Sequence, residues 1–572
     1  MTDRRGPRIT SVATIALGLL LRAGGICADP YPVAPEVDVQ HYRFAIDLSD
    51  DTDRIQVYAR LDLELATPGP AQVQLDLRQK SAQRENRGMT LRAVSSERQA
   101  LSYTHHADRI TIELPPELRA QRRVRIDLHY DGVPETGLII GPNKHGDRTF
   151  FSDNWPNKAR HWLATVDHIA DKATAEFIVT APSRLQVVSN GTRLEQSVLE
   201  GGLTRTHWRQ SVPISPWLYV LGAAEFAIQQ VDQFQGKPIE TWVYWQDRDA
   251  GFHDFAEPTK DALAFFSSYV GPFEYEKLAN IQSNSVGGGM EAASAILYGD
   301  DSVSGANPRS RRWQTVIVHE LAHQWFGNSV TESSWDDVWL SEGFATYFSF
   351  LFFEHAQGKA EFDRHLIDAR TRALAFSDEQ PDYRVQHANL QDMAKVTTRQ
   401  IYDKGAWILH MLRHQIGDRA WWSGVRSYYR RHRNAIAQTS DFRRAMERAC
   451  ECELGQFFDY WLRSGSTVKL DARWHYDAST GRLQIDVTRR GHSTGAPPMT
   501  LEAAVYPESS PLPTLVAIPL DNEGGAATLD MEERPVRILL DPHTRILASW
   551  ELSETAPGTR GGATKTTIRA QP

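Results

Sequence analysis

One stretch restricts this chain more than any other: "HELAHQWFGN", residues 319–328, followed by Glu342 in "WLSEGFATY". Residues four apart lie on one face of a helix, so His319 and His323 can present two imidazoles to one cation. Zinc sites for hydrolysis keep three protein ligands and one open position. Glu342 supplies the third ligand if its helix folds back on the first. The pattern therefore predicts two helices that meet at one metal ion.

Glu320 follows the first histidine and points in an adjacent direction, near the open position of such a site. A carboxylate there suits a general base that activates water. The pattern H-E-x-x-H also occurs where both histidines are ordinary hydrogen-bonded core residues, so the rest of the chain has to decide between the two interpretations. Asp336 and Asp337, just before Glu342, could be partners of a ligand histidine or caps of the helix that begins there.

The periodicity of the hydrophobic residues changes twice along the chain, which predicts a multidomain α+β protein. Strand-like alternation, as in "IQVYARLDLEL" at 55–65, dominates the first part, helical spacing dominates the middle, and alternation returns near Val468. We expect an N-terminal antiparallel β domain, a mainly helical catalytic domain and a small C-terminal β-sandwich. The expected ranges are 29–240, 241–464 and 465–552, with a disordered polar tail over 553–572.

The first residues are typical of a secretory signal. Three arginines in the first eight residues precede an apolar run at 12–21 and small residues up to Ala28. We expect a signal peptide at 1–28 and an exported protein, periplasmic or extracellular. The sequence leaves lipid attachment at Cys27 open, although Ile26 is bulky where such motifs prefer a small residue. The apolar run is too short to span a bilayer, and no integral span is expected in the mature chain.

Charge and cysteine content exclude some classes of protein. A net charge of -9 over 572 residues is mild and argues against nucleic acid as a partner. Three cysteines cannot form a disulfide framework. Cys450 and Cys452 flank one residue, where a disulfide would be strained, so we expect structural thiols, with an oxidised pair as the minor alternative.

Four linked segments resemble the gluzincin aminopeptidases, the family of aminopeptidase N and leukotriene hydrolase. They are "HELAHQWFGN" with "EGFATY", "GGGMEAASAI" at 287–296, "YDKGAWILHML" at 402–412 and "NWPNKARHWLATVDHIADKATAEFIVTAP" at 154–182. Their order and spacing match that family, and the resemblance covers the chain from about Val37 to Trp550. It implies a thermolysin-like catalytic domain.

The resemblance also implies a role for each metal-site residue. His319, His323 and Glu342 look like the ligands of one zinc ion. Glu320 looks like the general base that takes a proton from the attacking water. Tyr402 looks like the donor that stabilises the oxyanion, and such a donor acts on charge that develops only in the transition state.

The "GGGME" segment is implied to bind the substrate. Glu291 looks like the anchor for a free α-amine, which would fix cleavage one residue from the amino end. Gly287, Gly288, Gly289 and Met290 precede it, and the glycines permit close approach of the backbone to a substrate.

Three positions depart from the family pattern. Ala292 and Ser341 stand where the family usually has asparagine. Trp155 stands where a glutamine or glutamate gives the amine a second anchor, a function that Asn154 or Asp153 could take over.

Many members of the family carry a helical domain that covers the active site. Few residues follow Trp550 here, so we expect an open cleft.

The resulting hypothesis is a zinc aminopeptidase that acts on peptides with a free amino terminus. An endopeptidase or an epoxide hydrolase on the same metal is the nearest alternative. A non-catalytic binding scaffold is disfavoured because every expected ligand and the base are present. The sequence leaves the side-chain preference and the oligomeric state open.

Overall fold

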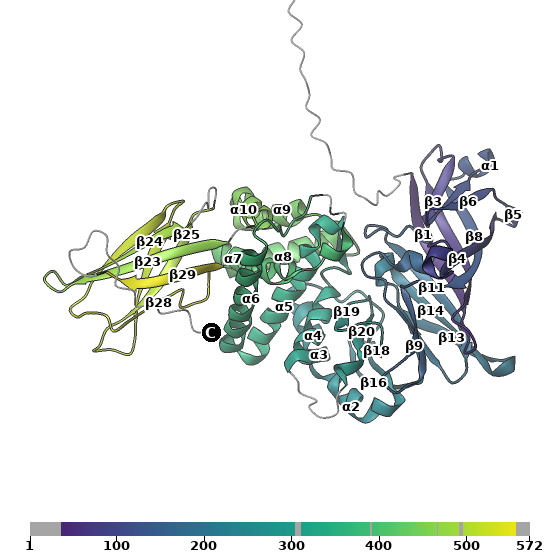
Figure 1. The fold of residues 1–572 in the computed structure, drawn as a ribbon, viewed down its shortest axis with the longest axis horizontal. Coiled ribbons are helices and arrows are strands. Elements are labelled where there is room, and N and C mark those ends of the chain that lie inside the picture. The colour runs from purple at the N-terminus through teal and green to yellow at the C-terminus, as the bar shows by residue number, and fades with distance from the viewer. Residues whose placement is uncertain are drawn as a thin grey trace, which may run out of the picture.

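The computed structural model describes residues 36–303, 311–388, 390, 392–465, 467–490 and 496–555. The expected signal peptide at 1–28 and residues 556–572 of the expected tail lie outside them. Three parts follow one another along the long axis of the molecule (Figure 1). A β-rich N-terminal part lies at one end, a largely helical part in the middle, and a C-terminal pair of sheets at the other end.

An eight-stranded sheet organises the N-terminal part. Strand β2 alternates buried and more exposed residues as its sequence predicts, because one face of the sheet covers the core. All neighbouring strands are antiparallel except β1 and β11, which run parallel with Phe44 opposite Phe177. In sheet order the strands are β13 (Thr192–Leu199), β14 (Leu203–Ile214), β11 (Ala173–Pro182), β1 (Val37–Asp47), β2 (Ile55–Leu65), β8 (Arg123–Val133), β4 (Gly88–Ser96) and β5 (Gln99–Ala100).

Two smaller sheets complete this part. One has the order β12 (Gln186–Ser189), β15 (Leu221–Ala224), β10 (Arg148–Ser152) and β9 (Leu138–Pro142). The other has the order β3 (Gln72–Asp76), β7 (Arg109–Glu113) and β6 (Tyr103–His106), followed along the chain by the short helix α1 (Pro116–Arg119).

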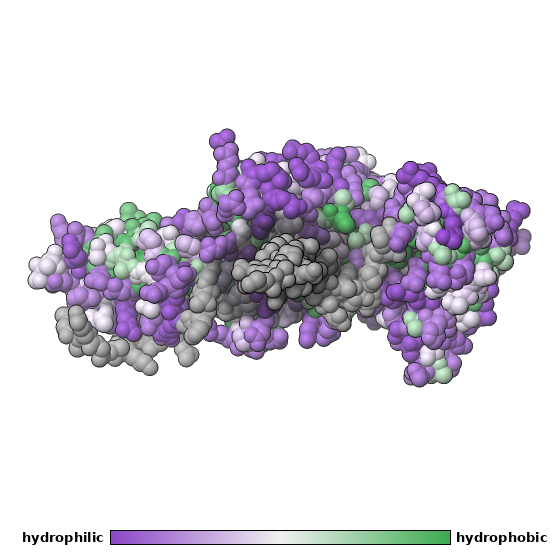
Figure 2. Space-filling model, turned by 90° about the horizontal axis from the view of Figure 1, so that it is seen from above, coloured by the Kyte–Doolittle hydropathy of each residue, from purple (hydrophilic) through white to green (hydrophobic). Residues whose placement is uncertain are grey.

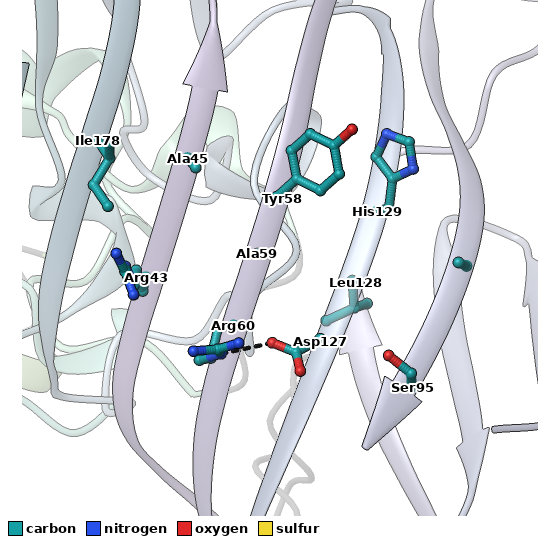
Figure 3. Close-up of a pocket in the computed structure, with 11 residues that line it drawn as sticks. Arg43, Ala45, Tyr58, Ala59, Arg60, Ser95, Asp127, Leu128, His129 and Ile178 are labelled. Atoms are coloured by element: carbon teal, nitrogen blue, oxygen red, sulfur yellow. Dashed lines mark hydrogen bonds and ion pairs between the residues drawn. The ribbon is translucent and has the colours of Figure 1, made fainter. Parts of the chain in front are cut away.

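The polar face of the large sheet carries a shallow hollow of about 370 Å³ (Figure 3). The ring of Tyr58 stacks on His129 at 4.2 Å, and Arg60 Nε donates to Asp127 Oδ1 at 2.6 Å. Small side chains such as Ala45 leave the space between them open. None of the expected site residues lines this hollow.

A five-stranded sheet begins the central part, and sequence periodicity did not predict it. Its order is β16 (Phe226–Phe234), β17 (Lys237–Tyr244), β18 (Leu278–Ser283), β20 (Ala295–Gly299) and β19 (Gly289–Met290). Strands β17 and β20 both pair with β18 in parallel. The domain boundary expected at residue 240 falls inside β17.

Most of the central part is helical, and α5 forms its core. Fifteen consecutive residues of α5, from Trp339 to Phe353, are buried. Gly358 and Gly417 follow α5 and α7 directly, whereas α4 ends at His323, four residues before Gly327. The helices are α2 (Arg248–Asp254), α3 (Ala256–Tyr269), α4 (Arg311–His323), α5 (Trp339–Gln357), α6 (Lys359–Glu379), α7 (Gly405–Ile416), α8 (Asp418–His432), α9 (Thr439–Cys450) and α10 (Gly455–Arg463).

Two short strands, β21 (Val330–Glu332) and β22 (Ala435–Ala437), pair in parallel between the helices. Over the part of the chain that the structure describes, no helix combines the length and the apolar character that crossing a membrane requires.

Two sheets pack together at the C-terminal end. The first has the order β27 (Gly524–Asp530), β24 (Arg482–Arg490), β23 (Val468–Asp477) and β29 (Ala548–Glu554); the second has β26 (Thr514–Leu520), β25 (Met499–Tyr506) and β28 (Arg537–Leu540). Arg370 of α6 joins them to the helices through an ion pair with Asp541 at 2.7 Å. Figure 2 shows apolar side chains on this end of the molecule, where Leu512, Leu515, Val536 and Leu539 are exposed.

Cys450 and Cys452 form a disulfide, which corrects the expectation of two free thiols. Glu451 between them adopts a left-handed backbone at φ 55° as α9 ends. This turn brings the two Cα atoms to 5.2 Å, within the usual range for a disulfide.

Helix α5 and the helical segment Gln400–Lys404 with α7 touch at two glycines. A Cβ atom on Gly343 would lie 3.0 Å from the Cα of Gly405 and 3.2 Å from the carbonyl oxygen of Ile401. The atoms that meet at this contact belong to the backbones of the two helical segments, so no side-chain rotation could make room for a Cβ. This contact fixes the distance between Glu342 on α5 and Tyr402 on the facing segment.

We predict that Gly343→Val separates these helices. Inserting side-chain atoms into a filled contact costs about 1–3 kcal/mol of stability. Calorimetry should show a lower melting temperature for the central part. Gly141→Val is the matched control, because a Cβ there meets nothing within 4 Å. Equal melting temperatures for the two variants would contradict the prediction.

Candidate active site

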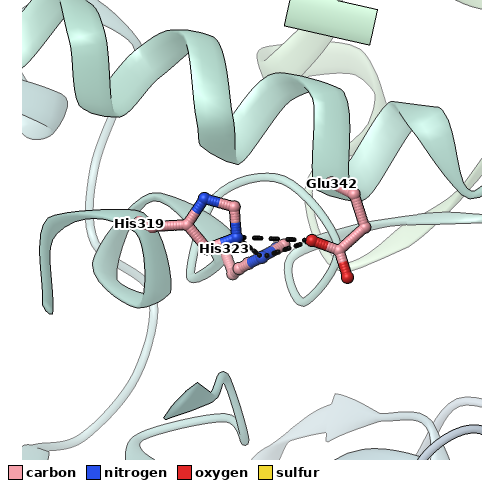
Figure 4. Close-up of side chains that lie close together, drawn as sticks. All are labelled: His319, His323 and Glu342. Carbon is pink, nitrogen blue, oxygen red and sulfur yellow. Dashed lines mark hydrogen bonds and ion pairs between the residues drawn. The ribbon is translucent and has the colours of Figure 1, made fainter. Parts of the chain in front are cut away.

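Three side chains converge where α4 meets α5 (Figure 4). His319 and His323 extend from the last two turns of α4, and Glu342 extends from the first turn of α5. His319 Nε2 lies 3.0 Å from His323 Nε2, and Glu342 Oε2 lies 3.3 Å and 3.2 Å from these two nitrogens. The structure thus brings together the three residues that the sequence predicts as metal ligands.

The spacing of these atoms fits a zinc ion. Ligand atoms about 2.1 Å from a tetrahedral zinc lie roughly 3.4 Å from one another. The three atoms here approach that spacing, and His323 and Glu342 are buried at 1% and 4% exposure. The geometry therefore supports one zinc held by His319, His323 and Glu342.

The electrostatics of the cluster also favour a cation. Burial opposes charge on His323, but the carboxylates of Glu291 and Glu342 raise the pKa of this imidazole to about 10. Burial likewise opposes charge on Glu342, but His323 and His319 lower its pKa to about 2. Both shifts express the same preference for positive charge between the imidazoles and the carboxylates.

The other nitrogen of His323 is fixed by the protein. His323 Nδ1 lies 3.0 Å from the carbonyl oxygen of Phe326 and 3.0 Å from Ser341 Oγ. A proton on Nδ1 that these oxygens accept leaves Nε2 unprotonated and free to bind a metal. Ser341, noted in the sequence only as a departure from the family, is therefore a partner of a metal ligand.

Glu320 is placed beside the ligands, next to the strand β19. It is buried at 6% exposure, and burial together with the Glu291 carboxylate raises its pKa well above the usual range. A Cβ atom on Gly289 would overlap the carboxylate of Glu320. A side chain at position 289 would therefore displace the Glu320 carboxylate from this position. A Cβ on Gly287 or Gly288 would meet nothing within 4 Å, so these two glycines border open space.

Glu291 lies on the same side of the cluster. Its Oε1 is 3.9 Å from His323 Nε2 and has no hydrogen-bond partner within the described residues, although the side chain is 5% exposed. Burial raises the pKa of Glu291 to about 7. A buried carboxylate oxygen without a donor is costly, so the geometry provides a place for a positively charged or hydrogen-bonding group.

Two residues just after the metal helix hold the Glu291 loop. Gln324 Nε2 and Asn328 Nδ2 donate to the carbonyl oxygen of Glu291 at 3.0 Å and 2.5 Å. Gln324 Oε1 also accepts from the amide of Ser294 at 3.0 Å. Sequence reasoning missed both residues, although they stand within the same "HELAHQWFGN" stretch as the ligands.

The N-terminal domain supports this arrangement. Lys172 Nζ donates to the carbonyl oxygens of Asn328 and Ser329, both at 2.8 Å. Asn190 Nδ2 donates to the carbonyl oxygen of Ala293 at 2.7 Å. Burial lowers the pKa of Lys172 to about 7. The N-terminal domain therefore holds both the chain just after Glu291, at Ala293, and the Asn328 loop that bonds to Glu291.

Tyr402 reaches the cluster from a short π-helical segment, Gln400–Lys404. Its hydroxyl donates to Glu342 Oε1 at 3.0 Å, and its ring lies 5.9 Å from that of His319. Burial and the Glu342 carboxylate raise the pKa of Tyr402 well above the usual range, so the phenol stays protonated. A hydroxyl donor is thus available beside the ligands.

Trp155 packs against other tryptophans. Its ring meets the rings of Trp217 and Trp335 edge to face at 4.9 Å and 4.7 Å. Asn154 Nδ2 donates to the carbonyl oxygen of Tyr219, and Asn154 Oδ1 accepts from Trp162.

Asp153 Oδ2 pairs with Lys158 Nζ at 2.5 Å. Asn154 and Asp153, the two substitutes considered from the sequence, are therefore committed to contacts inside the N-terminal domain.

The Asp337 carboxylate accepts hydrogen bonds from residues other than the ligand histidines. Its Oδ1 accepts from Thr439 Oγ1 and Gln386 Nε2, both at 2.7 Å. Asp336 Oδ1 accepts from the amide of Leu390 at 2.8 Å. Helix α5 starts after Val338, whose side chain makes no capping bond. The capping interpretation is therefore wrong for Asp337 and α5.

Comparison with known proteins agrees with the site. Residues 256–461 match the peptidase family M1 domain, and residues 40–218 match the peptidase M1 N-terminal domain. The chain belongs to the M1 peptidase family. The matched ranges include every expected metal ligand, the base and the tyrosine.

Relatives of this M1 chain include human glutamyl aminopeptidase (Homo sapiens), 29% identical over 345 residues, 59% of this chain and 36% of the relative. Aminopeptidase M1 of Arabidopsis thaliana is 26% identical over 344 residues, 58% of this chain and 38% of the relative. The matches thus span little more than a third of each relative.

Two solved structures share the fold. Legionella pneumophila aminopeptidase A in complex with aspartic acid superposes with a TM-score of 0.76 at 18% identity, over 91% of this chain and 60% of that one. An M1 zinc metallopeptidase variant from Deinococcus radiodurans, bound to a Tyr-Ser-Ala substrate, superposes with a TM-score of 0.64 at 22% identity. The match covers 77% of this chain and 98% of the other.

We predict that Ser341→Ala weakens metal binding. Loss of a hydrogen-bond partner of a ligand histidine typically costs 10- to 100-fold in metal affinity, and the Phe326 carbonyl remains, so a loss of about tenfold is expected. Competition with a chelator measures it. Ser349→Ala is the control, because Ser349 bonds to the Thr346 carbonyl and to no ligand. Unchanged affinity in Ser341→Ala would contradict the role given to Ser341.

Proposed function

We propose that this chain is a zinc aminopeptidase that hydrolyses the first peptide bond of peptides with a free amino terminus. The observation that carries the proposal is the position of Glu291. A buried carboxylate with an unpartnered oxygen lies 3.9 Å from a residue of the metal cluster, His323. A substrate ammonium bound there would place the adjacent peptide bond beside the ligands. The relatives named above as aminopeptidases support this proposal.

His319, His323 and Glu342 would hold zinc, which when bound would supply Lewis-acid polarisation of the scissile carbonyl and of the attacking water. Glu320 accepts the proton of that water and delivers it to the amine that leaves. Its raised pKa in the buried site suits a group that both takes and returns a proton. General acid–base catalysis of this kind contributes on the order of 10²–10⁴-fold.

Tyr402 stabilises the charge that develops on the carbonyl oxygen. Its hydroxyl already lies within 3.0 Å of a ligand carboxylate, Glu342, so a small rotation turns the donor towards the substrate. Because the oxyanion exists only in the transition state, this hydrogen bond accelerates the reaction rather than tightening ground-state binding.

The strand β19 orients the peptide. It is the edge strand of the five-stranded sheet and carries Gly289 and Met290, immediately before Glu291. An extended peptide can add to such an edge through main-chain hydrogen bonds. The strand would thereby align the substrate backbone while Glu291 fixes its first residue.

The endopeptidase and epoxide hydrolase alternatives use the same metal and base. They differ from the proposal in one respect: neither requires a free α-amine at Glu291. The binding-scaffold alternative requires no turnover at all. Substrates with free and blocked amino groups therefore separate these possibilities.

We predict that the chain from Asp29 onward, loaded with zinc, releases alanine stepwise from an alanyl peptide and leaves the acetylated peptide intact. Glu320→Gln should lower kcat at least about 100-fold, because the proton acceptor is lost. Zinc content, measured by mass spectrometry, should remain at one ion per chain. Amino-acid analysis of timed samples follows the products.

Cleavage of both peptides would favour an endopeptidase. Turnover that persists in Glu320→Gln would indicate a contaminating peptidase. Full zinc occupancy with no turnover of either peptide would favour the scaffold.

The proposal includes export to the periplasm or the extracellular space. The signal-like residues 1–28 support it, and so does the Cys450–Cys452 disulfide, because disulfides persist mainly in oxidising compartments. We predict that the mature protein starts at Asp29, which amino-terminal sequencing of the exported fraction checks. A protein that retains Met1 in the cytosol would contradict export.

A further inference from the structure

A cavity of about 630 Å³ extends from the metal site to helix α6. At one end it is lined by His319, Glu320 and Tyr402, and at the other by arginines of α6 and of the segment before Tyr402. Its volume is within the range of pockets that bind small ligands. On the proposed function, the part of the substrate that leaves occupies this cavity, because Glu291 holds the first residue.

Two arginines of this cavity are already paired. Arg372 makes a two-point contact with Asp403, with nitrogen–oxygen distances of 3.0 Å and 2.7 Å. Arg364 bonds to Asp368 at 3.0 Å and to Glu361 at 2.5 Å. Their charges are therefore largely balanced by carboxylates.

Arg399 differs from both. It lines the same cavity and is exposed, and it forms no hydrogen bond or ion pair with any residue in the described ranges. Of the three guanidinium groups that line this end of the cavity, those of Arg364 and Arg372 are bonded to carboxylates of Glu361, Asp368 and Asp403, whereas that of Arg399 is bonded to none in the described ranges. The Arg399 guanidinium thus remains available to a ligand.

The spacing from Tyr402 places this charge relative to the cleaved bond. Arg399 stands three residues before Tyr402, and both residues line the same cavity. An extended residue spans about 3.5 Å, so a carboxylate two residues beyond the cleaved bond lies roughly 7 Å from it. A guanidinium beside Tyr402 can reach that distance.

We propose that Arg399 binds a carboxylate on the leaving part of the substrate, so that short peptides ending there are preferred. This inference rests on the proposed function and names the substrate class. The carboxylate can be the carboxyl terminus of a tripeptide or an acidic side chain. Guanidinium is suited to both, because its planar N–H groups match a carboxylate in two contacts.

The test compares three peptides: Ala-Ala-Ala, its carboxyl-terminal amide, and Ala-Asp-Ala amide. For the wild type, we expect kcat/KM to be about tenfold higher for the free acid than for its amide, the effect of one charge-assisted hydrogen-bonded contact. The advantage should shrink as salt is added, because an exposed ion pair is screened. A high value for Ala-Asp-Ala amide would identify a side chain as the source of the carboxylate.

Arg399→Gln should abolish this preference while leaving kcat/KM for Ala-Ala-Ala amide within about twofold. Arg399→Lys should keep part of the preference, because it retains the charge. Arg431→Gln is the matched control, since Arg431 is an exposed arginine of α8 that does not line the cavity. The proposal is overturned if acid and amide react equally in the wild type, or if Arg399→Gln keeps the difference.

A binding experiment separates this inference from the proposed function. Zinc-loaded Glu320→Gln protein is titrated with Ala-Ala-Ala and with its amide in a calorimeter, with and without Arg399→Gln. Tighter binding of the acid that depends on Arg399 supports the carboxylate site even if the wild type hydrolyses neither peptide. Equal binding of acid and amide refutes it even if both are hydrolysed.

Discussion

The meeting of α4 and α5 at three ligand atoms is the constraint on which the rest of the structure depends. Two imidazole nitrogens and a carboxylate oxygen lie 3.0–3.3 Å apart in a buried site. Bringing such groups together out of water is unfavourable unless a cation compensates them. Apolar packing must therefore hold both helices, and Phe326 does so against Phe344 and Phe348 at 4.9 Å and 4.6 Å. The early end of α4 at His323 lets the chain turn so that Phe326 can also bond the ligand imidazole.

Residues of both the N-terminal and the central domain hold the loop that carries Glu291, so the N-terminal domain contributes to the site. Lys172 holds the loop at Asn328, and Asn328 holds the carbonyl of Glu291. Removing the first domain would therefore release the residue proposed to select the substrate amine. Family membership over both matched regions fits this interdependence, because neither region completes the site alone.

Local patterns predicted the helices and the ligands well, because an i, i+4 pair on a helix needs little tertiary information. The five-stranded sheet escaped notice for a physical reason. All six residues of β18 are buried, so the strand has no polar–apolar alternation to detect. Ser341 and Gln324 were equally invisible as site residues, since their roles depend on which atoms face them after folding. The Cys450–Cys452 disulfide depended on a left-handed Glu451 that no periodicity encodes.

Selectivity for a free amine can rest on one carboxylate if that carboxylate is buried. Trp155 provides an aromatic contact where a second polar anchor was expected, and Asn154 is committed elsewhere. Glu291 nevertheless lies at 5% exposure with an oxygen that has no donor in the described chain. Breaking a buried ion pair by removing one partner costs about 3–5 kcal/mol, which corresponds to a factor of 100 or more. On the proposed function, a blocked substrate would leave Glu291 in that state, so discrimination would follow from the penalty of an unpaired charge rather than from the number of anchors.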